Sequence, residues 1–142
     1  MNAPIRVVVV DDEHCRRAVC GWFADTDDIL IAGEAQNGVE VLPWLCQVRP
    51  DVVLIDVNAA EAEQMRRIAA CAGVIVLHGS GQEALVLDAF RAGALGHLDK
   101  QNIRPPQAVA AVRAVSRGEA VLSPNLAGRI VDAVAERGRK EK

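Results

Sequence analysis

Acidic residues follow two of the short apolar runs in this sequence. A run of valines leads directly into Asp11 and Asp12, and a run of valine, leucine and isoleucine leads into Asp56. A residue that directly follows a buried parallel strand lies at the carboxyl edge of the sheet, where open α/β sheets bind their ligands. Three carboxylates at one edge need a cation, and oxygen donors favour a hard divalent ion. Because Lys100 follows another apolar run, the sequence predicts a site that binds a metal and handles phosphate.

The elements that position these residues follow from an alternating pattern. Apolar runs of strand length alternate with segments of helical periodicity, which is typical of repeated βαβ units. The predicted strands are 5–10, 29–34, 52–56, 74–78 and 94–98, and the predicted helices are 14–25, 38–48, 60–71, 82–92 and 105–117. Pro43 falls inside the second predicted helix, so we expect a kink there. The pattern predicts an α/β fold in which a five-stranded parallel, doubly wound sheet is covered by five helices.

Composition and charge narrow the class of protein. The chain has 142 residues, of which 51% are hydrophobic and 25% charged, as in a single folded domain rather than a disordered chain. The formal net charge of -3 argues against a general affinity for nucleic acid or anionic membranes. No apolar stretch reaches the roughly 20 residues that a membrane span needs. We therefore expect a cytoplasmic protein that makes no membrane contact.

Two further features concern the cysteines and the end of the chain. The four cysteines form no C-x-x-C pair and have no histidine at ligand spacing, which argues against structural zinc and a disulfide framework. Leu126, Ile130, Val131 and Val134 recur at helical spacing, which predicts a short helix near the end of the chain. A charged tail follows that helix.

The spacing of Asp11, Asp12, Asp56 and Lys100 resembles the acidic pocket of the receiver domains of two-component response regulators. The likeness extends to GEAQNG at 33–38, RPDVVLID at 49–56 and FRAGA at 90–94. The closing GEAVLSP at 118–124 resembles the NarL/FixJ subfamily in particular. The resemblance implies the flavodoxin-like receiver fold with strand order 2-1-3-4-5. It also implies a receiver domain at 1–122 and a linker helix with a charged tail at 123–142, the DNA-binding domain of that subfamily being absent from this chain.

The family's roles are carried over where the motifs match. Asp56 would accept a phosphoryl group from a sensor histidine kinase. Mg²⁺ would be held by Asp12, Asp56 and the backbone carbonyl of Asn58, with Asp11 reaching it through water. Lys100 would contact the phosphoryl group. The resemblance implies a signalling domain rather than an enzyme, with slow self-dephosphorylation at most and an output to transcription through a separate DNA-binding domain.

The sequence departs from the family pattern at the residues that respond to phosphorylation. An ungapped match places His78 where receivers carry a switch Thr or Ser, and places His97 at the position of the aromatic switch residue. A loop shorter by two residues would instead bring Ser80 to the hydroxyl position. The loop at 57–64 lacks the family's usual proline and later glycine.

These departures leave two other functions open. One is a pseudo-receiver that acts as an interaction module without phosphorylation. The other is a phosphate-metabolising hydrolase, which is disfavoured because Asn58 stands where a second acid would be needed. The hypothesis also includes a homodimer. It would use either the surface formed by the fourth strand, fourth helix, fifth strand and fifth helix, or the first and fifth helices. Leu85, Val86 and Leu87 in the fourth helix are apolar enough to leave some surface exposed, which favours an interface there.

Overall fold

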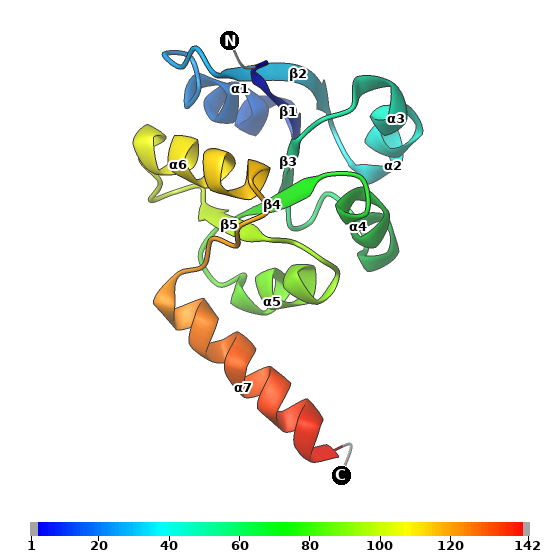
Figure 1. Ribbon diagram of the computed structural model, residues 1–142, viewed down its shortest axis with the longest axis vertical. Coiled ribbons are helices and arrows are strands. Elements are labelled where there is room, and N and C mark those ends of the chain that lie inside the picture. The colour runs from blue at the N-terminus through cyan, green and yellow to red at the C-terminus, as the bar shows by residue number, and fades with distance from the viewer. Residues whose placement is uncertain (1–2, 141–142) are drawn as a thin grey trace.

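Five parallel strands form one sheet in the computed structural model, which describes residues 3–140 (Figure 1). The strands are β1 Ile5–Val10, β2 Ile29–Ala35, β3 Val52–Asp56, β4 Gly73–His78 and β5 Gly96–Asp99. They pair in the order β2-β1-β3-β4-β5, so the predicted strand order and fold class are confirmed. The central strands β1, β3 and β4 consist almost wholly of buried Val, Ile and Leu, as expected for a sheet covered on both faces.

The helices differ in number from the prediction. They are α1 Glu13–Gly21, α2 Gly38–Val41, η1 Leu42–Trp44, α3 Leu45–Val48, α4 Ala62–Ala69, α5 Glu83–Arg91, α6 Pro105–Ser116 and α7 Pro124–Lys140, with η1 a 3₁₀ turn. Six α-helices lie between residues 3 and 122, so the predicted count of five is wrong by one. The predicted helix 38–48 is interrupted at Pro43, whose ring replaces a backbone N–H and turns the chain into η1. The expected kink is confirmed.

The last strand begins later than predicted. Residues 94 and 95 belong to the turn after α5, where Gly93 adopts a positive φ of 116° and the amide of Ala94 bonds to the carbonyl of Ala89. Strand β5 therefore runs from Gly96 to Asp99. Glycine suits this turn because a side chain at a positive φ is strained.

The core has two layers, one on each face of the sheet. Alternate residues of β1, β3 and β4 point to opposite faces, as the period of a strand requires. Val8, Val53 and Val74 face the layer under α2 to α5, whereas Leu54 and Ile75 face the layer under α1 and α6. The helices on either side thus hold the strand ends in a fixed relation.

Helix α7 leaves the domain at an angle (Figure 1). Its first turn is anchored by Leu126, which is only 4% exposed and belongs to the core beside α5. Val131 and Val134 are each 66% exposed. In the part of the chain from 3 to 140, no helix combines the length and apolar character needed to cross a membrane. Residues 141 and 142 of the predicted charged tail lie outside the described residues.

Candidate functional site: an acidic pocket and a histidine pair

The strand ends bring Asp11, Asp56 and Lys100 together. Strands β1 and β3 are neighbours, so the residues that end them lie side by side. The backbone amide of Lys100 donates to the carbonyl of His78, which positions the lysine over the same edge. Its ammonium Nζ lies 3.0 Å from Asp11 Oδ2 and 2.9 Å from Asp56 Oδ1. One cation therefore bridges two carboxylates, at the place where the sequence pattern predicted a site.

The electrostatics of this pocket are those of a crowded anionic site. Asp11 is only 3% exposed. Burial raises the pKa of Asp11, and the charge of Asp56 raises it further, whereas hydrogen bonds from Lys100 and the Asp12 amide lower it. Burial by itself would lower the pKa of Lys100, but its bonds to Asp56 and Asp11 raise that pKa above its usual value. Lys100 therefore stays charged and partly offsets the repulsion between the carboxylates.

Backbone amides fix the direction in which each carboxylate points. The amide of Asp12 donates to Asp11 Oδ1, and the amide of Asn58 donates to Asp56 Oδ2. Asp12 is the N-cap of α1, and its Oδ1 accepts from the amide of Cys15 at 2.8 Å. That bond is the main reason why the pKa of Asp12 is lowered. The three carboxylates are thus held in fixed orientations at one edge.

The donor set fits a hard divalent cation. Oxygens of Asp11 and Asp12 lie within 4.8 Å of each other and of the Cys15 sulfur. Lys100 pairs with Asp11 and Asp56, while Asp12 accepts only the backbone amide of Cys15 among the hydrogen bonds described above, so the three carboxylates carry more negative charge than Lys100 offsets. A carboxylate oxygen that accepts one hydrogen bond still has a lone pair for a metal, and such oxygens are the ligands that Mg²⁺ prefers.

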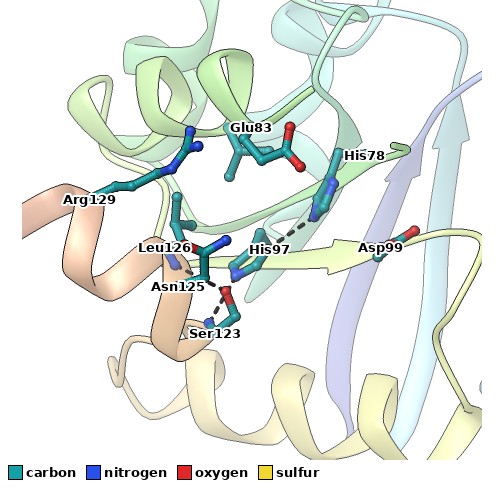
Figure 2. A pocket seen from close by; sticks show the side chains of 9 residues that line it. His78, Glu83, His97, Asp99, Ser123, Asn125, Leu126 and Arg129 are labelled. Carbon is teal, nitrogen blue, oxygen red and sulfur yellow. Dashed lines mark hydrogen bonds between the residues drawn. The ribbon is translucent and has the colours of Figure 1, made fainter. Parts of the chain in front are cut away.

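His78 is the last residue of β4, and His97 is the second residue of the neighbouring strand β5. Their side chains point toward each other (Figure 2). Nε2 of His78 lies 3.0 Å from Nδ1 of His97, and the rings stack with centroids 5.2 Å apart. Nε2 of His97 accepts a hydrogen bond from the backbone amide of Ser123 at 3.0 Å. Ser80, the alternative hydroxyl, bonds to Gln101. Within residues 3–140, no side-chain hydrogen bond joins either histidine to the acidic pocket.

The sequence model of the response regulator receiver domain family matches residues 7–113. This range includes all these carboxylates, Lys100 and both histidines. The chain belongs to the response regulator receiver domain family. Receiver domains are signalling domains.

Known proteins similar to this receiver include both transcriptional regulators and stand-alone receivers. It is 30% identical over 141 residues to the transcriptional regulatory protein LiaR of Bacillus subtilis, covering 94% of this chain and 66% of LiaR. It is 30% identical over 118 residues to the chemotaxis protein CheY of Thermotoga maritima, covering 79% of this chain and 98% of CheY. The solved receiver domain of the putative response regulator NarL from Mycobacterium tuberculosis has a TM-score of 0.74 at 26% identity, covering 83% of this chain and 100% of that domain.

The fraction of each relative's length that this chain covers limits what the relative implies about function. This receiver spans 58 to 61% of the length of two further transcriptional regulators of Bacillus subtilis that it matches. The likeness therefore concerns the receiver portion of those proteins, and the homologues place the family in two-component signalling and transcriptional regulation.

Sequence reasoning missed several residues near the receiver's site. Cys15, for which the sequence suggested no role in a site, lies 3.7 Å from Lys100 Nζ. Its position three residues after the capping Asp12, in the first turn of α1, was the available signal. Ser123, Glu83 and Arg129 line a cavity of about 210 Å³ with the two histidines. No local pattern marks these three, because they come together only when α7 docks.

Proposed function

We propose that this receiver accepts a phosphoryl group on Asp56 from the phosphohistidine of a sensor histidine kinase. The observation that carries the proposal is the contact of Asp56 Oδ1 with Lys100 Nζ at 2.9 Å, beside the buried Asp11. A carboxylate oxygen of Asp56 attacks the phosphorus, the bond from phosphorus to the kinase's imidazole breaks, and an acyl phosphate forms. Lys100 offsets the charge on the phosphoryl oxygens as a point charge.

We propose Mg²⁺ as the cofactor of this transfer. Asp12, Asp56 and the backbone carbonyl of Asn58 would hold the ion, with Asp11 reaching it through water. When bound, the ion neutralises charge on the transferred phosphoryl group. The bond from the Cys15 amide and the bond from the Asn58 amide keep the Asp12 and Asp56 carboxylates in place for this role.

The output that we propose is transcriptional. The support is the likeness to LiaR, a transcriptional regulatory protein, and DNA would be bound only through a domain that this chain does not contain. In this proposal, residues 1–122 form the receiver, 123–142 form the linker helix and charged tail, and the protein acts in the cytoplasm. It would have no activity of its own beyond slow self-dephosphorylation.

His78 and His97 are proposed as the residues that read the phosphoryl group. The support is the resemblance, which matches them to the two switch positions, together with their mutual contact: His78 ends β4, and His97 is the second residue of β5. A homodimer remains part of the proposal. Of the three residues offered for its surface, Val86 lies on the buried face of α5, so that part of the prediction is wrong, whereas Leu85 is 41% exposed.

One observation favours a second function, that of a pseudo-receiver acting as an interaction module. Both nitrogens of His78 are directed away from the carboxylates, one at His97 and the other at the carbonyl of Gly79. A switch side chain that is occupied in this way does not need a phosphoryl group as its partner.

Intact-mass measurement separates the two functions. The chain is incubated with a small acyl phosphate and Mg²⁺, and we expect a gain of one phosphate that is lost in excess EDTA and in Asp56→Asn. Asp51→Asn is the matched control, because Asp51 bonds to the amide of Arg6 outside the pocket and its loss should leave the gain intact. A wild-type chain that gains no phosphate would reject phosphoryl acceptance in favour of the interaction module.

A further inference from the structure

Three hydrogen bonds in series join the loop after β4 to the start of α7. Figure 2 shows the two that link His78, His97 and Ser123. The amide of Ser123 can only donate, so Nε2 of His97 must accept. A neutral His97 then carries its proton on Nδ1 and donates it to Nε2 of His78, 3.0 Å away. The proton of His78 is thereby placed on Nδ1, which faces the carbonyl of Gly79 at 3.3 Å. We call these three groups, His78, His97 and the Ser123 amide, the histidine chain.

One backbone amide therefore determines the protonation of both rings. Ser123 precedes α7, and its hydroxyl oxygen accepts from the amide of Leu126 in the first turn of that helix. Leu126 is in turn buried in the core beside α5. The histidine chain is thus the polar part, and Leu126 the apolar part, of one contact that docks α7 on the receiver.

Protonation of either ring breaks the same bond. A charged His97 carries a hydrogen on each nitrogen, so it cannot accept from Ser123. A charged His78 carries a hydrogen on Nε2, which opposes the hydrogen on Nδ1 of His97. His97 can relieve that clash only by moving its proton to Nε2, and it then faces the Ser123 amide with a donor.

The surroundings of the rings favour the neutral state. Burial lowers the pKa of His97 and the neighbouring His78 lowers it further, whereas Asp99 raises it. The ring also packs edge-on against Phe90 of α5, with centroids 6.1 Å apart. The charged side chains that face the cavity from the packed elements are Glu83 of α5, Asp99 of β5 and Arg129 of α7.

We propose that the histidine chain is a pH-dependent docking contact, which holds α7 on the receiver while both imidazoles are neutral and releases it on acidification without phosphorylation. The docked state favours the neutral ring. The contribution of this preference to the docking free energy is therefore complete above the ordinary histidine pKa of about 6.5, and it is lost as the pH falls through the lowered pKa of the docked ring. The working range is roughly pH 7.5 to 5.5. The inference does not depend on Asp56 being phosphorylated.

Nuclear magnetic resonance on the whole chain tests this inference in two ways. Long-range ¹H–¹⁵N spectra at pH 7.5 should show both His78 and His97 protonated on Nδ1. Amide exchange, corrected for the intrinsic rate at each pH, should show the protection of Ser123 falling roughly tenfold at pH 5.5, as expected for the loss of one hydrogen bond. The protection of Val53 and Ile55 in β3 should not change.

Variants identify the groups responsible. The double variant His78→Gln/His97→Gln keeps a donor and an acceptor at each position without titrating, so the pH response should vanish. His97→Phe removes the acceptor and should leave Ser123 weakly protected at both pH values. His14→Gln, which changes the exposed histidine of α1, and Glu83→Gln should each keep the wild-type response.

Any of three results would overturn the inference. The first is a double variant that keeps the wild-type pH response. The second is a wild-type protection of Ser123 that does not change between pH 7.5 and 5.5, and the third is a wild-type His97 protonated on Nε2 at pH 7.5; neither of these needs a variant to fold.

Discussion

Two polar clusters of this receiver, the acidic pocket and the histidine chain, are stabilised by opposite means. In the acidic pocket, charges of one sign crowd together, and Lys100 compensates Asp11 and Asp56 through contacts of 3.0 and 2.9 Å. In the histidine chain, neutral rings are joined by directional hydrogen bonds to the amide of Ser123. The first cluster should therefore respond to divalent cations and be indifferent to pH near neutrality. The second should respond to pH and be indifferent to cations.

Removal of the Lys100 ammonium should have the largest effect. Breaking one side of a buried ion pair costs about 3–5 kcal/mol, and because Lys100 partly faces solvent, we expect Lys100→Ala to lose about 2–4 kcal/mol of unfolding free energy in EDTA. Mg²⁺ should stabilise the variant more than the wild type, since the ammonium no longer competes for the carboxylates. Urea titrations with and without Mg²⁺ measure both effects.

The control for that experiment is Arg66→Ala, which removes an exposed arginine paired with Glu63 on α4. It should change neither the stability in EDTA nor the response to Mg²⁺ appreciably. If Mg²⁺ raised the unfolding free energy equally in Lys100→Ala and in the wild type, the ammonium would not compete with Mg²⁺ for the same region.

The apolar part of the α7 contact should have the next largest effect. Leu126→Ala removes a side chain that is 4% exposed, and we expect a loss of about 2–3 kcal/mol in docking free energy, measured as lower exchange protection of the Ser123 amide at pH 7.5. Val131→Ala, at a position that is 66% exposed, should change it by less than about 0.5 kcal/mol. Similar effects of the two substitutions would show that α7 is not held through Leu126.

An exposed ion pair far from both clusters should have the smallest effect. Arg113 contacts both carboxylate oxygens of Asp28, at 2.8 and 2.9 Å, and this bonding lowers the pKa of Asp28. The pair's contribution is present above the ordinary carboxyl pKa and is lost as the pH falls through the lowered value. Thermal unfolding of Arg113→Ala should thus differ slightly from wild type at pH 7 and low salt, and the two should converge at pH 2 or in high salt. A difference that persists there would assign Arg113 a packing role.

The sheet and the acidic edge were predictable because both depend on local sequence. Runs such as Val52–Ile55 favour buried strands. A residue that directly follows such a strand lies at the carboxyl edge of the parallel sheet. Pro43 likewise fixed the break in the second helix by removing a single backbone donor. The hydrophobic period, the burial of a strand and the missing N–H of a proline can each be predicted from a few neighbouring residues.

The histidine chain was not predictable for the opposite reason. The predicted strands place His78 at the end of one strand and His97 inside the next, but their mutual contact depends on the register in which β4 pairs with β5. The amide that orients them belongs to Ser123, 26 residues after His97. The partial error over Val86 has the same origin: the helical period marks an apolar face, but only the docked arrangement of α5 shows which of Leu85 and Val86 is covered.

The most direct test of phosphoryl acceptance at Asp56 is the ¹H–¹⁵N spectrum of the chain with Mg²⁺ and beryllofluoride, which adds to a carboxylate oxygen and mimics an acyl phosphate. We expect the amides of Asp56, Asn58 and Lys100 to shift in the wild type and to stay unchanged in Asp56→Asn. A wild-type spectrum that does not respond, or the same shifts in Asp56→Asn, would contradict the assignment of Asp56 as the phosphoacceptor.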